Sequence, residues 1–254
     1  MLQDLVAGNV YAFILIFCRL GAAMMTLPGI GENSITPRAR LAIALLTAAL
    51  TVPVLGPLLP PLPAQPFHLA FLVVSEIGFG LALGLVARLT VSAMHIAGSI
   101  IAMQAGLAAA MFFDPNQGSQ SALVSSALVF LGVALIFVTD LHLLAIRAAY
   151  DSYTLFPPAQ APAFGDFARV ATDLVATSFA LGLKLAGPFI VYGIVFNVAL
   201  GLLNRLMPTL QIFFIMQAPQ IAFAFLLLGL ALTAMGLSFT SYVEEHLSQF
   251  LAPK

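Results

Sequence analysis

Charged residues are scarce in this chain. They make up 7% of its 254 residues, whereas hydrophobic residues make up 61%. A soluble domain carries roughly 25% charged residues, so this chain has too few charges to cover a surface that faces water. It must be solvated by lipid or by other apolar protein. The net charge of -1 offers no attraction for phosphate, and no nucleic-acid partner is expected.

Cysteine and the sequence patterns of enzymes are also missing or nearly so. The single cysteine, Cys18, excludes an intrachain disulfide and a cysteine-cluster metal site, and its apolar surroundings predict a buried, inert thiol. The four histidines have no metal-ligand spacing. Neither G-x-S-x-G nor H-E-x-x-H occurs, and there is no phosphate-binding glycine loop. We therefore expect no enzyme, no cofactor and no metal.

Long apolar runs fill most of the chain. A helix needs about 20 apolar residues to span a bilayer, and lipid requires every backbone polar group to be satisfied inside the helix. The sequence therefore predicts an all-α integral membrane protein of about six or more long apolar helices arranged as hairpins, in a single domain over residues 1–254. The runs are Leu5–Leu27, Leu41–Leu59, Phe67–Phe113, Ala122–Tyr150, Phe167–Leu203 and Leu210–Tyr242.

The run Phe67–Phe113 is too long for one span. As a single helix it would extend about 70 Å at 1.5 Å per residue. Two interpretations are open: two spans, with a break in the polar stretch Arg88–His95, or long helices that extend beyond the bilayer.

Several charged residues lie inside the apolar runs, where each costs about 2.5–3.5 kcal/mol at a helix centre. One interpretation is an ion or proton path. The favoured one is pairing within the protein, or helices not fully exposed to lipid, because no two acidic residues share a helix face. Asp140 and Arg147 share a face but are too far apart to touch, so we expect them to reach neighbouring helices or the interface. The residues concerned are Arg19, Glu76, Arg88, Asp140, Arg147, Asp173 and Lys184.

Small residues recur at every fourth position in two places. Gly80 and Gly84 form one pair, and the second stripe is Gly98, Ala102, Gly106 and Ala110. Such stripes allow two helices to approach closely in a membrane. The stripes predict helix packing within one subunit or an interface between subunits.

Four blocks together resemble the FliR family of bacterial flagellar biosynthesis proteins. They are "RLGAAMMTLPGIGENSITPRARLAIAL", "AGSIIAMQAGLAAAMFFDPNQGSQSALVS", "LHLLAIRAAYDSY" and "GLLNRLMPTLQIFF". They keep the family's order and are spread over residues 19–214, and the last block carries its Asn204, Arg205 and Pro208. Thr209 and Gln211 depart from the family's usual Gln and Asn.

The resemblance implies a pore and structural subunit of the flagellar type III protein export gate. In that family the chain joins FliP and FliQ in a multi-subunit cone, with FlhB and FlhA as further partners, and unfolded flagellar export substrates pass through it. The implied location is the bacterial inner membrane at the flagellar basal body, in contact with membrane lipid. Two alternatives stay open: an SctT-type injectisome gate subunit and, from another class, a small-solute or ion transporter.

The resemblance also implies a role for the loop between the central helices, which plugs the pore in the family. Small residues allow a close fit, while Met and Phe side chains form an ion-tight apolar constriction. An ordinary hairpin turn is the competing interpretation. The implied plug is Gly106, Leu107, Ala108, Ala109, Ala110, Met111, Phe112 and Phe113, anchored by a turn of Asp114, Pro115, Asn116, Gln117 and Gly118.

Overall fold

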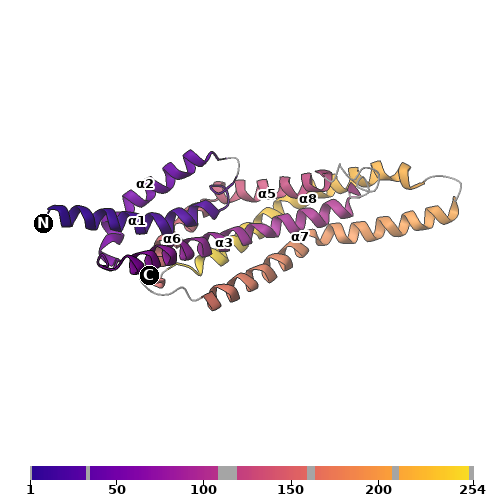
Figure 1. The fold of residues 1–254 in the computed structure, drawn as a ribbon. Coiled ribbons are helices and arrows are strands. Elements are labelled where there is room, and N and C mark those ends of the chain that lie inside the picture. The colour runs from indigo at the N-terminus through magenta and orange to yellow at the C-terminus, as the bar shows by residue number, and fades with distance from the viewer. Residues whose placement is uncertain (1, 33–34, 108–118, 159–163, 208–211, 252–254) are drawn as a thin grey trace. The chain divides into compact units, whose positions relative to one another are not determined.

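Helices make up all the regular structure in the described part of the chain, which is residues 2–32, 35–107, 119–158, 164–207 and 212–251 of a computed structural model (Figure 1). This confirms the predicted all-α class. The elements are α1 (Leu2–Thr26), α2 (Pro37–Leu55), η1 (Gly56–Leu58), α3 (Pro66–Gln104), α5 (Ser119–Val138), α6 (Leu141–Leu155), α7 (Phe164–Leu206) and α8 (Ile212–Ser248).

The chain divides into two compact units. Unit 1 comprises Met1–Thr90, Ile136–Val175 and Val243–Lys254, and unit 2 comprises Val91–Leu135 and Ala176–Tyr242. The helices α3, α5, α7 and α8 contribute residues to both units. The single domain expected over residues 1–254 stays a prediction.

Proline and glycine set the ends of the first two helices in unit 1. The helix α1 ends at Thr26, two residues before Pro28, and Gly29 follows with a positive φ of 87°. The helix α2 begins at Pro37, a residue suited to the first helical turn. The Thr36 hydroxyl caps it by accepting a hydrogen bond from the Ala39 N–H. The two helices lie side by side (Figure 1), and one apolar core joins them to α6.

The predicted break in the third apolar run is wrong, and the long-helix interpretation holds. The helix α3 continues through Arg88–His95 for a total of 39 residues, which is about 58 Å at 1.5 Å per residue. Arg88 and His95 are exposed, and the Thr90 hydroxyl donates to the Ala87 carbonyl of the same helix at 2.7 Å. The stretch holds neither Pro nor Gly, the residues that most often break a helix. The helix therefore continues through it.

The run Ala122–Tyr150, expected as one span, is instead two helices. The helix α5 ends at Val138 and α6 begins at Leu141. Asp140 precedes α6 with a φ of 58°, in the left-handed region that Asp tolerates better than most residues. A residue in this conformation cannot continue a right-handed helix, so the apolar run breaks here.

Five helices of the described residues are long and apolar enough to cross a membrane, and counting α5 and α6 as one broken span gives six. This agrees with the expected integral membrane protein. The helices differ in how much of their most apolar window is buried: 56% in the first span and 44% in α3, but 22% in α7 and 17% in both α2 and α8. The last three therefore present apolar side chains outward, where lipid or another protein must cover them.

Candidate functional site: a buried ion pair between long helices

Arg19 of α1 and Glu76 of α3 form an ion pair inside unit 1. The Arg19 Nε donates to Glu76 Oε2 at 2.6 Å, and Nη2 donates to Oε1 at 2.9 Å. Both side chains have no exposed surface. The paired geometry matches the planar fork of the guanidinium to the carboxylate. The structure thus brings together two of the charged residues found in the apolar runs.

The remaining guanidinium nitrogen of Arg19 binds the end of α6. Its Nη1 donates to the backbone carbonyls of Ser152 at 3.2 Å and Phe156 at 3.0 Å, and to the Ser152 hydroxyl at 3.4 Å. The carbonyls at a helix C-terminus carry partial negative charge, and Arg19 is a second donor to the Ser152 carbonyl, which also accepts from the Phe156 N–H at 2.8 Å. Arg19 therefore joins α1, α3 and α6 through one side chain.

Aromatic rings close over the charged pair. The Arg19 guanidinium carbon lies 4.1 Å from the Tyr153 ring centroid and 4.9 Å from that of Phe79. The Phe79 ring also packs against Phe156 with centroids 5.5 Å apart. Both rings provide a negative face to the cation and keep water from it.

Glycines bring α3 close to α1 beside this pair. Glu76, Gly80 and Gly84 recur every fourth residue and so share one helix face. A Cβ added at Gly80 would overlap the backbone carbonyl of Arg19, and one at Gly84 would overlap Thr26. The small residues thus allow the close approach that places Glu76 opposite Arg19.

The other charged residues do not join this pair. Arg88, Asp140, Asp173 and Lys184 are exposed. Arg147 pairs with Asp151, one helical turn away, at 3.6 Å, and its side chain is about half exposed at 53%.

The second stripe of small residues lies in unit 2. A Cβ at Gly98 would overlap the backbone of Ser125 in α5, and Ala102 is fully buried. Gly106 ends the described part of the stripe with a φ of 80° and lies against the Gln220 side chain. Ala110 is outside the described residues.

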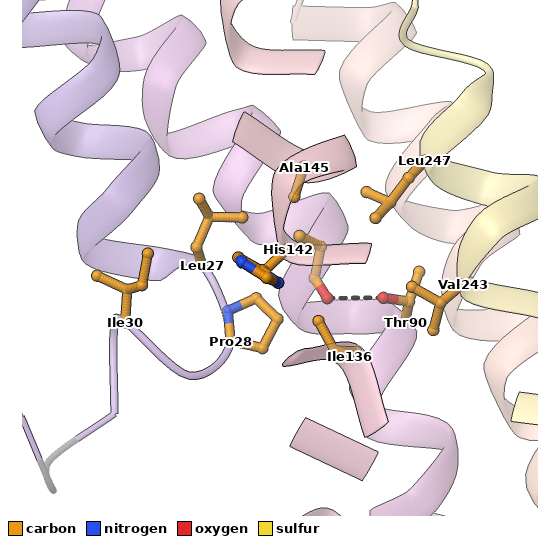
Figure 2. A pocket seen from close by; sticks show the side chains of 10 residues that line it. Leu27, Pro28, Ile30, Thr90, Ile136, His142, Ala145, Val243 and Leu247 are labelled. Carbon is orange, nitrogen blue, oxygen red and sulfur yellow. Dashed lines mark hydrogen bonds between the residues drawn. The ribbon is translucent and has the colours of Figure 1, made fainter. Parts of the chain in front are cut away.

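A narrow cavity near the end of α1 holds one polar atom without a partner. Figure 2 shows His142 pointing into it beside Pro28 and Thr90. The His142 ring stacks on Phe137 with centroids 4.7 Å apart, and its Nδ1 is buried and makes no hydrogen bond within the described structure. The cavity volume is only about 10 Å³, which is room for one water molecule. It is too small for a substrate.

The described ranges contain no group of three or more His, Cys, Asp or Glu side chains that could hold a metal ion. Cys18 is partly buried. The two buried charged side chains of these ranges, Arg19 and Glu76, bind each other. Their role is therefore to hold the helices together.

Most of the implied plug lies outside the described residues. Gly106 and Leu107 are described, and Gly106 lies two residues after the end of α3 at Gln104. Residues 108–113 and the implied anchoring turn 114–118 are not. In the family block, Asn204 and Arg205 are exposed at the C-terminal end of α7, and Pro208 is outside the described residues.

Sequence reasoning missed the partners of these sites. It did not single out Ser152 and Tyr153 around Arg19, or Gln220 beside Gly106 in unit 2. Their signal was weak: a neutral hydroxyl or amide within an apolar run, which becomes informative only when the partner helix is known.

These features define a class: an α-helical membrane protein whose long helices are held by a buried ion pair and close glycine contacts. Comparison with known proteins identifies the family. The model of the bacterial export proteins, family 1, matches residues 10–246. The chain belongs to this family of the flagellar export apparatus.

Curated relatives match 82% to 96% of the chain. The flagellar biosynthetic protein FliR of Caulobacter vibrioides is 40% identical over 244 residues, which is 96% of this chain and 97% of the relative. FliR of Pectobacterium carotovorum is 33% identical over 85% of this chain and 82% of the relative. FliR of Escherichia coli is 31% identical over 82% of this chain and 78% of the relative.

Proposed function

We propose that this chain is a pore and structural subunit of the flagellar type III protein export gate, without catalytic activity. It assembles with FliP and FliQ, with FlhB and FlhA nearby, in the bacterial inner membrane at the flagellar basal body. Unfolded flagellar proteins are the cargo. Family membership supports the link to flagellar export, and the curated relatives named above favour the flagellar over the injectisome assignment.

The outward apolar faces of the long helices carry the proposal of a multi-subunit assembly. Val198 of α7 is 59% exposed and Leu230 of α8 is 75% exposed. Both helices bury only about a fifth of their most apolar window. Packing of side chains and small residues drives helix association in membranes, so these faces suit sister subunits as well as lipid.

Residues 106–113 are proposed as the apolar plug of the gate, with residues 114–118 as its anchor. Among the described residues, Gly106 supports the proposed plug. Its φ of 80° turns the chain away from the axis of α3. The composition after the turn, small residues followed by Met111, Phe112 and Phe113, suits a constriction that excludes water and ions.

A small-solute or ion transporter has less support. Such a protein needs a charged or polar site that its solute can reach, whereas Arg19 and Glu76 are fully buried and bound to each other. The charged residues Arg88 of α3 and Lys184 of α7 are each exposed.

The plug is tested by measuring ion leak in cells that express the assembled gate. We expect the double substitution of Phe112 and Phe113 by Ser to raise uptake of a small dye or of sodium severalfold, because a polar constriction stays wet. The matched control replaces Leu58 and Leu62 by Ser; both are apolar and exposed but lie far along the chain from the loop. Unchanged permeability of the Phe112 and Phe113 variant, in a gate that still assembles, would contradict the plug.

A further inference from the structure

Two other helices of unit 2 hold the C-terminal end of α3. The Gln220 Nε2 of α8 donates to the Gln104 backbone carbonyl at 3.2 Å. The Tyr192 hydroxyl of α7 donates to the Gln220 backbone carbonyl at 2.7 Å. Gln220 is only 7% exposed. We call these three residues the clasp.

The clasp provides a donor to a backbone carbonyl at the end of α3. The last carbonyls of a helix lack N–H partners within it. At this end the Ala105 N–H donates to Ile101 and the Gly106 N–H to Met103, while the Gln104 carbonyl accepts from Gln220. Gln104 is half-buried, and a carbonyl held away from water without a donor is costly, so the side-chain amide of Gln220 stabilises this particular end of α3.

The turn that follows is fitted to the same amide. Gly106 has a φ of 80°, and a Cβ there would come within 2.8 Å of Gln220 Oε1 and 3.1 Å of Nε2. Gly193, next to Tyr192 on α7, lies against the side chain of Gln104. Glycine is thus used on both sides of the clasp to let the helices and the turn come close.

The residue after the turn lies at an apolar hollow. Leu107 lines a small hollow together with Ala105, Val124, Ala224 and Leu228. Beside the exit of the chain from α3 there are therefore one hydrogen bond, at the Gln104 carbonyl, and the apolar hollow that Leu107 lines.

We propose that Gln220 is a positioning residue of the gate: by clasping Gln104 and covering Gly106 it sets the direction in which the chain leaves α3 toward residues 108–113. The proposal rests on the proposed plug for its functional consequence. Loss of the Gln220 amide releases the exit turn, so a gate with an intact plug sequence becomes leaky.

The direct test is hydrogen–deuterium exchange in the purified complex with FliP and FliQ. We expect Gln220→Met, which keeps the length of the side chain but has no donor, to speed exchange of the Ala105 and Gly106 amides by roughly three- to tenfold, the effect of one lost net hydrogen bond. Tyr192→Phe, the milder variant, should speed it less. Gln217→Met on the same helix is the matched control and should leave these amides unchanged.

The functional test measures ion leak for the same variants. Gln220→Met should leak, whereas Gly80→Ala should lower the melting temperature without leak because it loosens α1 and α3 in unit 1. Unchanged exchange in Gln220→Met would overturn the clasp. Faster exchange without leak, in a gate that does leak when Phe112 and Phe113 are replaced by Ser, would overturn the positioning role alone. If neither variant leaks, the proposed plug itself fails.

Discussion

Arg19 and Glu76 lie 57 residues apart in the sequence and meet through two hydrogen bonds of 2.6 and 2.9 Å, with neither side chain exposed. The attraction between two buried charges only offsets the cost of removing them from water when the remaining polar atoms are also satisfied. The Ser152 and Phe156 carbonyls provide this for Arg19. The pair therefore specifies how α1, α3 and α6 pack.

Breaking the pair from one side should destabilise the protein strongly. We expect Glu76→Ala to cost about 3–5 kcal/mol, because it leaves the Arg19 charge buried without its counter-ion. Replacing both residues, Arg19→Met with Glu76→Leu, should recover most of the loss. Thermal unfolding in detergent measures the effect.

The exposed ion pair on α6 serves as the control for that experiment. Arg147 and Asp151 are 3.6 Å apart and partly exposed, and such pairs contribute about 0–1 kcal/mol. Arg147→Ala should therefore shift the unfolding midpoint little. Equal effects of Glu76→Ala and Arg147→Ala would show that burial does not govern the energetics of the pair.

Alanine at Gly80 or Gly84 should push α3 away from α1. The added methyl group overlaps the Arg19 carbonyl at Gly80, and the Ala23 carbonyl and Thr26 at Gly84. We expect each variant to lower the unfolding midpoint, since rigid backbone cannot move aside cheaply. Gly229→Ala in α8 meets open space and should be neutral or stabilising by about 0.5–1 kcal/mol. A similar loss in all three variants would exclude the close approach as the cause.

Gly29→Ala should destabilise the loop after α1 for two reasons. The φ of 87° disfavours a side chain, at a cost of order 1–3 kcal/mol, and a Cβ would overlap the Phe137 ring. Adding Phe137→Leu should recover only the part caused by the overlap. The unfolding midpoints of the single and double variants separate the two contributions; complete recovery in the double variant would mean that backbone strain plays no part.

The helical class could be predicted because it depends on local signals, but the predicted bounds missed several helix ends: the second run was placed at Leu41–Leu59, and α2 is Pro37–Leu55. Apolar runs of the required length, Pro28 and Gly29 after α1, and Thr36 with Pro37 before α2 are all visible in the sequence. The polar stretch around Arg88 misled the prediction because polar residues on an exposed helix face do not interrupt backbone hydrogen bonds. The break at Asp140 was missed because its left-handed φ leaves no signal in an apolar run.

The site could be predicted only in part because its contacts join distant residues. Both Arg19 and Glu76 stand out by their charge, but their spacing says nothing about their pairing. Gln220 does not stand out at all: a neutral amide becomes significant only once the end of α3 and the turn at Gly106 are known to lie beside it.

Co-purification tests the central claim most directly. The chain carries one affinity tag and is expressed with untagged FliP and FliQ, and the detergent extract is analysed by size-exclusion chromatography and mass measurement. We expect a single stable complex that contains all three proteins, because the apolar faces of α7 and α8 then find their sister helices. A stable, well-behaved monomer that excludes both proteins would contradict the claim.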